Sequence, residues 1–188
     1  KVWGKAHFSR INGSWGGVGE SDQTRFEYKS KGSKYTQAHA QLVELAKNFN
    51  HLEGQAFEDY VAQHINIPLL LKGLASEAVL GHWDGFWGNG NNFFIYIDES
   101  EVMHFVPYDT DNTLGTSLLV GDVGERDPLQ FASSNDAPLL VRKILAIKRY
   151  SAEYQGYLKD LVTESGLMRQ EDSLPWIESV HQMIRDEL

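Results

Sequence analysis

The residue types that could bind a cation or move a proton are concentrated between residues 82 and 115. Asp84 opens a polar, glycine-rich stretch, and Asp109 and Asp111 lie near the end of the segment. The asparagines between Asp84 and Asp109 are Asn89, Asn91 and Asn92. Carboxylate and amide oxygens are the ligands that hard cations such as Mg²⁺ prefer. The segment therefore predicts a magnesium site, provided that the fold brings its two ends together.

Two runs of bulky and β-branched residues separate these two polar groups. The runs are Phe93–Ile97 and Val102–Val106, and the polar turn Asp98–Ser100 lies between them. This pattern predicts a β-hairpin with largely buried strands. Because a hairpin brings its ends together, the amide-bearing loop before it and the acidic loop after it should face a shared gap.

This order of residues matches the requirements of phosphoryl transfer. A carboxylate must orient the acceptor hydroxyl or accept its proton, and further oxygen ligands must hold metal ions on the phosphates. Along a protein kinase chain the catalytic Asp comes first, and a metal-binding Asn and a metal-binding Asp follow. Asp84, the asparagines and Asp109 stand in the same order. An isolated Asp-x-Asp sequence is more often a turn, so the prediction depends on the combined pattern.

The segment resembles the CotH kinase family, named after spore coat protein H. The resemblance is carried by Asp84, by Asn92 leading into the aromatic strand Phe93–Tyr96, and by the run Pro107–Asp111 followed by Gly115. It is strong over about residues 80–116 and weaker over the flanking helices. The resemblance implies an atypical protein kinase that uses ATP and Mg²⁺. It also implies phosphorylation of Ser or Thr in secreted or coat proteins, and a location outside the cell, at its surface or in a coat.

The resemblance also assigns roles to individual residues. Asp84 corresponds to the catalytic carboxylate, and Asn92 and Asp109 correspond to metal ligands, with Asp111 as an additional ligand. Ordinary kinase spacing from the catalytic Asp points instead to Asn89, and Asn91 is a further alternative. We expect Asn91 and Trp83 to contribute to nucleotide binding. Trp83 and Trp87 flank the site, where they either wall a pocket or belong to the core.

The rest of the sequence predicts an α+β fold, a mainly helical lobe with one central hairpin and a few strands near the N-terminus. A strand is expected within Thr24–Lys29. The expected helices are Tyr35–Asn50, Gln55–His64, Pro68–Leu80, Ala137–Ile147, Ala152–Thr163 and one from about Leu174 to the C-terminus. Asp136 is the expected N-cap of the fourth, and Ser173 and Pro175 the expected start of the last. Residues 1–188 read as one domain, the C-terminal-lobe part of a CotH kinase domain. The Lys and Glu of a kinase small lobe are not matched, and we expect that lobe upstream.

Charge and composition exclude several other functions. The chain has 26 acidic and 17 basic residues, a net charge of −9, which argues against nonspecific nucleic-acid binding. It has no cysteine, so thiol catalysis and disulfides are excluded. The sequence has no membrane-length apolar run. Two alternatives remain open: a non-catalytic CotH-like surface or adhesion module that binds partners, and a metal-dependent hydrolase that uses the same carboxylates.

Overall fold

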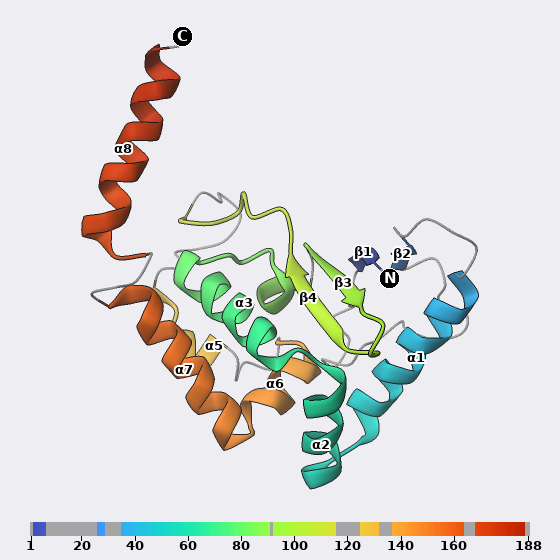
Figure 1. The fold of residues 1–188 in the computed structure, drawn as a ribbon. Helices are drawn as coiled ribbons and strands as arrows, with labels where there is room; N and C mark the ends of the chain where they lie inside the picture. The colour runs from blue at the N-terminus through green and yellow to red at the C-terminus, as the bar shows by residue number, and fades with distance from the viewer. Residues whose placement is uncertain are drawn as a thin grey trace.

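The computed structural model of the chain describes residues 2–6, 26–28, 35–90, 92–115, 125–131, 137–163 and 168–186. These residues form a mainly helical α+β fold around an antiparallel hairpin (Figure 1). The predicted combination of helices, a central hairpin and N-terminal strands is therefore confirmed at this level.

The hairpin belongs to a four-stranded antiparallel sheet. The strands lie in the order β2 (Phe26–Tyr28), β1 (Val2–Ala6), β3 (Phe93–Ile97) and β4 (Met103–Pro107). β3 and β4 pair without interruption from Phe93 opposite Pro107 to Ile97 opposite Met103. The second hairpin strand thus lies one residue later than predicted, and β2 falls within the predicted strand at Thr24–Lys29.

Of the four helices described before the hairpin, three lie at the predicted positions, and the short α4 (Phe86–Asn89) was not predicted. The three are α1 (Tyr35–His51), α2 (Gly54–His64) and α3 (Ile67–Leu80). At the start of α3 the side-chain oxygen of Asn66 accepts a hydrogen bond from the backbone N–H of Leu69 at 3.1 Å, as an N-cap does. α3 ends at Gly81, whose φ of 64° is the left-handed conformation in which glycine commonly ends helices. The next residues form the polar loop of the candidate site.

The helices after the hairpin depart from the predicted bounds. They are α5 (Pro128–Phe131), α6 (Leu139–Leu145), α7 (Lys148–Val162) and α8 (Gln170–Asp186). α6 is shorter than predicted: Pro138 occupies its N-cap position, and Asp136 lies outside the described residues. Ile147 has an extended backbone that separates α6 from α7, so α7 begins four residues earlier than expected. This start allows Tyr150 and Tyr154 to be buried on one face of α7.

The start predicted for the last helix is wrong. α8 contains Pro175 inside its span, whereas the sequence predicted Pro175 in the first helical position after Ser173. The backbone N–H groups of Asp172 and Ser173 both bond to the carbonyl of Arg169, at 3.0 and 2.9 Å. A hydrogen-bonded turn therefore forms ahead of the proline.

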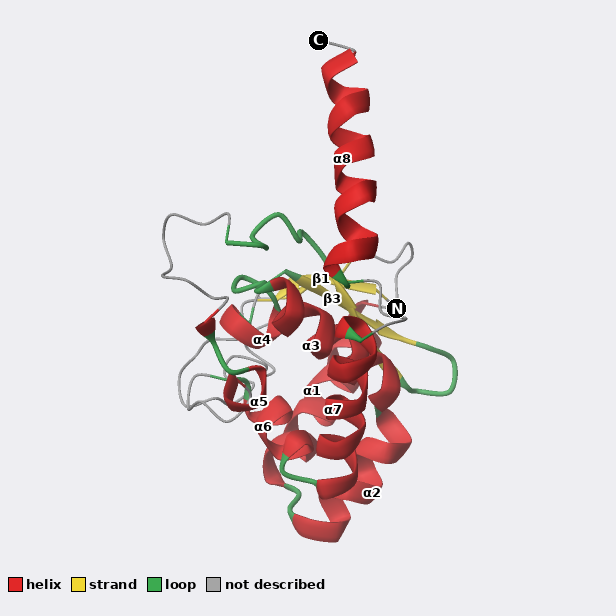
Figure 2. Ribbon diagram, turned by 90° about the vertical axis from the view of Figure 1, so that its left-hand side faces the viewer, coloured by secondary structure: helices red, strands yellow, loops and turns green. Residues whose placement is uncertain are grey.

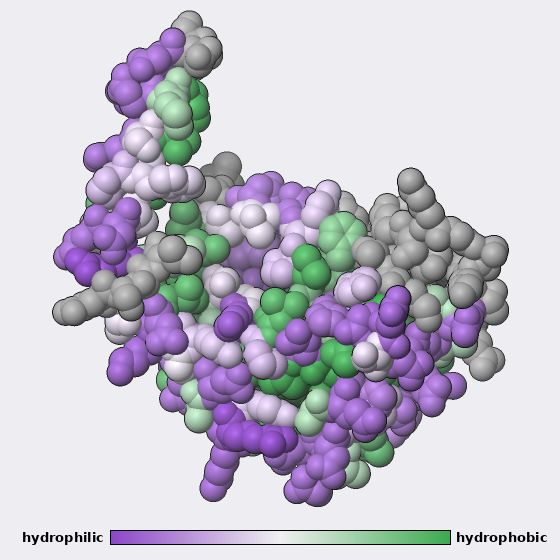
Figure 3. Space-filling model, viewed as in Figure 1, coloured by the Kyte–Doolittle hydropathy of each residue, from purple (hydrophilic) through white to green (hydrophobic). Residues whose placement is uncertain are grey.

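α8 extends away from the other helices (Figures 1 and 2). Apolar side chains gather along one side of it, visible as a green strip in Figure 3. Its large exposed apolar side chains are Leu174, Trp176, Ile177, Met183 and Ile184. Within the described part of the chain, α8 included, every helix is too short or too polar to cross a bilayer.

The core joins α3 and α7 to the hairpin and fixes the residues that follow Asp84. Leu74 of α3 and Phe93 of β3 are buried in the same cluster. The ring of Phe86, two residues after Asp84, lies 4.8 Å from the ring of Phe93 and 4.7 Å from that of Phe105. Burying a Phe side chain contributes roughly 2–3 kcal/mol. The loop that carries Asp84 is thereby anchored to both strands of the hairpin.

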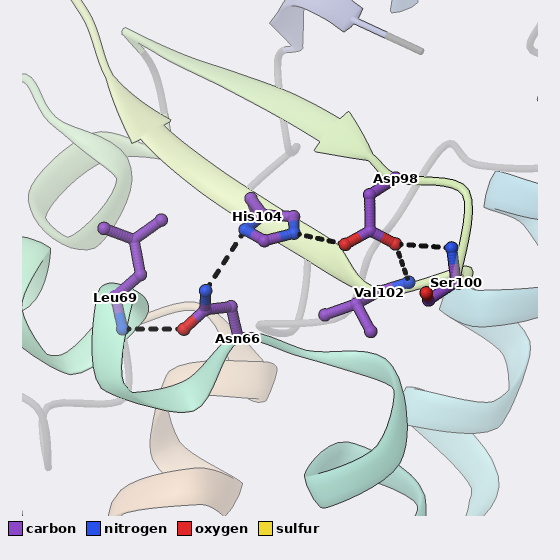
Figure 4. A network of polar contacts seen from close by, with 6 residues as sticks. All are labelled: Asn66, Leu69, Asp98, Ser100, Val102 and His104. Carbon is purple, nitrogen blue, oxygen red and sulfur yellow. Dashed lines mark hydrogen bonds and ion pairs between the residues drawn. The ribbon is translucent and has the colours of Figure 1, made fainter.

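A polar network ties the hairpin turn to the start of α3 (Figure 4). His104 Nε2 lies 2.9 Å from Asp98 Oδ2, and His104 Nδ1 lies 3.2 Å from Asn66 Nδ2. Because the Asn66 oxygen already accepts from Leu69, its Nδ2 is the donor to His104. Nδ1 of His104 must then be the acceptor, so its Nε2 carries the proton that is donated to Asp98. The two hydrogen bonds of His104, in the tautomer with the proton on Nε2, therefore fix the hairpin turn relative to the start of α3.

Replacing Asp98 should make folding less sensitive to acid. The hydrogen bond from His104, together with backbone bonds from Val102 and Ser100, lowers the pKa of Asp98 below its usual 3.8. A lowered pKa contributes stability that is present above pH 3.8 and is lost as the pH falls toward the folded-state pKa. We therefore expect Asp98→Asn to be less stable than the wild type near neutral pH.

Urea unfolding at about pH 6 and about pH 3 measures this difference, which should shrink on the acid side. Glu99→Gln, an exposed change in the same turn, is the control and should show no such trend. A difference between Asp98→Asn and the wild type that stays constant with pH would contradict the assigned interaction.

Candidate functional site

The hairpin places Asn92 and Asp109 on either side of its open end. The backbone N–H of Tyr108 donates to the carbonyl of Asn92 at 2.9 Å, which extends the pairing one step beyond Phe93 and Pro107. Asn92 and Asp109 both have left-handed backbones, with φ of 50° and 54°. Asn and Asp tolerate this conformation better than other non-glycine residues. The backbone therefore departs from the extended conformation at both residues, next to the open end of the hairpin.

Asn92 is bonded directly to Asp84. Its Nδ2 donates to Asp84 Oδ2 at 2.9 Å. Asn92 is buried and Asp84 half-buried. With the amide nitrogen facing Asp84, the amide oxygen is the atom of Asn92 that can serve as a ligand to a cation. The structure thus brings together two of the residues that the sequence singled out.

Two further hydrogen bonds attach the acidic loop to the end of α3. The backbone N–H of Leu114 donates to the carbonyl of Leu80 at 2.7 Å. The ring of His82 bonds through Nδ1 to the carbonyl of Asn112 at 3.2 Å, so Nδ1 is the nitrogen that carries the proton. These contacts place the loop containing Asp109 and Asp111 beside the loop containing Asp84.

Glu77, which no sequence pattern singled out, lies beneath the Asp84 loop. Its carboxylate accepts hydrogen bonds from the backbone N–H groups of Phe86, at 3.2 Å, and Trp87, at 3.0 Å. These groups begin the short helix α4 (Phe86–Asn89). Burial raises the pKa of Glu77 to about 7, against the lowering effect of the two backbone bonds. The available signal was its spacing, since Glu77 lies three residues after Leu74 on the inward face of α3.

The buried polar side chains of the described residues all surround this loop. They are Glu77, His82 and Asn92, with exposed fractions of 7%, 2% and 4%. Burying a polar group is costly unless hydrogen bonds compensate for it. Because these three side chains gather around one loop, their hydrogen bonds fix the conformation of that loop.

Two glycines let the loop pass close to its neighbours. A Cβ on Gly88 would lie 2.2 Å from the carbonyl oxygen of Trp83, and a Cβ on Gly85 would lie 2.6 Å from His82 Cδ2 and 2.7 Å from the Glu77 carboxyl. At Gly88 the Cβ would meet a backbone atom, so a side chain is excluded there, whereas at Gly85 it would meet two side chains that would have to shift. The glycine-rich composition of the segment is thus a packing requirement of the Asp84 loop.

The remaining predicted residues divide into three groups. Trp87 is buried in the core, with its ring 5.5 Å from that of Tyr154 in an edge-to-face contact, so it does not wall an open pocket. Trp83 is half-buried, and its indole N–H has no hydrogen-bond partner among the described residues. Asn89 is the last residue of α4, and Asn91 lies outside the described residues.

The side-chain oxygens near the hairpin end are of the chemical type that Mg²⁺ binds together with phosphates. Asp109 and Asp111 are exposed on the acidic loop, where Asp111 accepts a hydrogen bond from the Asn112 side chain at 3.0 Å. The described residues contain no cluster of three or more acidic, His or Cys side chains that forms a ready metal cage. Mg²⁺ is normally bound by one or two carboxylates plus substrate phosphates and water. The residue types of Asn92, Asp109 and Asp111 are compatible with that mode, in which a nucleotide would supply the other ligands.

Comparison with known proteins identifies the family of the chain. The family model described as "CotH kinase protein" matches residues 5–188. The chain therefore belongs to the CotH kinase family. It is also similar to Invasin CotH7 of Rhizopus delemar, with 26% identity over 107 residues. That match covers 55% of this chain and 18% of the relative, so the chain corresponds to a minor part of that protein.

Gly88→Ala and Gly156→Ala should change stability in opposite directions. The Cβ added at position 88 would press against the Trp83 carbonyl, and we expect a loss of roughly 1–3 kcal/mol in the free energy of unfolding, as for other overpacked sites. Gly156 lies in α7, and a Cβ there would meet no atom within 4 Å, so alanine should stabilise the helix by roughly 0.5–1 kcal/mol. Urea unfolding of both variants measures these changes. Equal stability of the two would show that the Asp84 loop is not packed as described.

The burial of Glu77 predicts a pH dependence of stability. A folded-state pKa of about 7 against the usual 4.5 means that the folded protein binds this proton more tightly than the unfolded chain. The free energy of unfolding should therefore fall by roughly 3 kcal/mol as the pH rises through this interval. Glu77→Gln should remove that fall.

The measurement is urea unfolding of both proteins at about pH 5 and about pH 8. Glu44→Gln, an exposed change on α1, is the matched control. The same decline in the wild type and in Glu77→Gln would contradict the assignment.

Proposed function

We propose that this chain forms the C-terminal-lobe part of an atypical kinase domain that transfers the γ-phosphoryl group of ATP to a Ser or Thr hydroxyl of a protein. The bond between Asn92 and Asp84 is the observation that carries the proposal. This bond sets the Asp84 carboxylate beside an amide whose oxygen can bind a cation. Both groups lie at the end of a hairpin whose other strand leads into Asp109. Family membership supports the same reaction class.

In this proposal Asp84 orients the acceptor hydroxyl and accepts its proton. A carboxylate offers about four lone-pair sites, so the bond from Asn92 leaves it able to accept a further hydrogen bond. Asn92 also fixes the Asp84 carboxylate, because a buried amide bonded to it limits its rotation. Such positioning lowers the barrier by keeping the reacting groups in line.

Asn92, Asp109 and Asp111 would hold Mg²⁺ on the phosphates, where the ion supplies charge neutralisation. The positions of Asn92 and Asp109 support this role, because both lie at the open end of the hairpin, just beyond the paired residues Phe93 and Pro107. Trp83, next to Asp84 and half-buried, is the proposed contact for the nucleotide, together with Asn91.

A second candidate function is a non-catalytic binding module at a cell surface. The name of the relative, an invasin, and the net charge of −9 favour it. A hydrolase using the same carboxylates would instead consume a phosphate or sugar ester without an acceptor protein. These functions differ in whether Mg²⁺ and ATP bind and in where the phosphoryl group goes.

Substitution of the two carboxylates tests the proposal in the full-length protein. Asp84→Ala should lower phosphoryl transfer by about 10²–10⁴-fold, as for loss of a general base, and leave Mg²⁺–ATP binding little changed. Asp109→Ala should lose both binding and transfer, because a metal ligand is removed. Transfer is followed with radiolabelled ATP, and binding by titration calorimetry.

Asp160→Ala, an exposed change on α7, is the control and should keep both properties. Full transfer by both test variants would refute the assignment of the site. Absence of nucleotide binding in the wild-type protein would favour the binding module, and ATP-independent ester hydrolysis would favour the hydrolase.

A further inference from the structure

A buried carboxylate supports the Asp84 loop from below. Glu77 is 7% exposed, and the hydrogen bonds described for it come from the backbone N–H groups of Phe86 and Trp87. No basic side chain forms an ion pair with it among the described residues. A buried charge without a cationic partner is costly to folding. A hydrophobic residue at this position of α3 would avoid that cost but would remove the acceptor of the Phe86 and Trp87 N–H groups, so the carboxylate serves the backbone of the next turn.

We infer that Glu77 is a positioning residue of the proposed phosphoryl-transfer site, which fixes Asp84 by binding the backbone of the next turn. The inference rests on the proposed role of Asp84. Phe86 follows Asp84 by two residues, and Gly85 between them passes so close that a Cβ there would lie 2.7 Å from the Glu77 carboxyl.

Asp84 is thus held between two anchors of different kinds. On one side Asn92 bonds to its carboxylate at 2.9 Å. On the other side Glu77 holds the backbone that follows it, and α3 supports Glu77 through fully buried neighbours such as Leu74 and Ala75. A displacement of a catalytic group by about 1 Å can cost about 10²-fold in rate. Loss of either anchor should therefore displace Asp84, and this displacement should lower kcat.

Glu77→Gln tests this role, because Gln has nearly the same shape but only one acceptor oxygen. One of the two backbone N–H groups then loses its partner. We expect hydrogen exchange of residues 82–92 to rise about tenfold, while exchange in α7 stays unchanged. In the full-length protein kcat should fall about 10- to 100-fold, with little change in the KM for ATP. Glu44→Gln on the exposed face of α1 is the control and should change neither readout.

Gly85→Ala provides a second variant that keeps the Glu77 carboxyl group. Its Cβ would push against His82 and the Glu77 carboxyl, and it should produce the same local exchange and the same loss of kcat. It also decides the case in which Glu77→Gln does not fold.

Three outcomes would overturn the inference: unchanged exchange in residues 82–92, faster exchange spread equally over α7, or an unchanged kcat despite a loosened loop. A wild-type protein that transfers no phosphate would refute the proposed function instead. The exchange measurement would then still decide whether Glu77 fixes the loop.

Discussion

The contact between Asn92 and Asp84 determines how the rest of this site is arranged. It joins the loop after α3 to the first residue before β3 through one hydrogen bond of 2.9 Å. The same Asn92 accepts the backbone N–H of Tyr108 through its carbonyl. One buried residue therefore connects the loop of Asp84 with the strand end that leads to Asp109. The arrangement requires a rigid hairpin, because any shift in register would move one partner away from the other.

The polar contacts of the site are built into an apolar support. Phe86 packs against Phe93 and Phe105, while the backbone beside it bonds to Glu77. The apolar contacts stabilise the loop without specifying its rotation, because dispersion and burial are not directional. Hydrogen bonds are directional, so they fix the rotation of the loop that the apolar contacts leave open. This division explains why the buried polar side chains of the described residues gather around a single loop instead of being spread through the core.

The sequence predicted those parts of the molecule that depend on local periodicity. The apolar faces of α1 to α3 and the two strand runs of the hairpin gave their positions to within a few residues. The hydrogen bond between Asn92 and Asp84 was not predicted, because both residues precede the hairpin and its topology alone does not pair them. Glu77 was missed because a lone acidic residue in a helix normally faces water, and its burial depends on a backbone segment that returns to it. The early start of α7 was missed because packing buries Tyr150 and Tyr154. Pro175 inside α8 was missed because a hydrogen-bonded turn forms ahead of the predicted cap at Ser173.

The backbone at the site also adopts conformations that a sequence alone does not reveal. Among the described residues, left-handed φ values at non-glycine positions occur at Asn92, Glu101, Asp109 and Leu114, and three of these four belong to the loops of the site. Each such residue costs roughly 1–2 kcal/mol for an ordinary side chain, and less for Asn and Asp. Leu114, the least suited of them, is held by the short bond from its N–H to Leu80. Strained residues persist only where surrounding contacts fix them, and they cluster at sites where geometry matters more than stability. Contacts with α3 therefore hold the acidic loop in backbone conformations that its own residues do not favour. These contacts keep the loop beside Asp84, the carboxylate with which it acts in the proposed reaction.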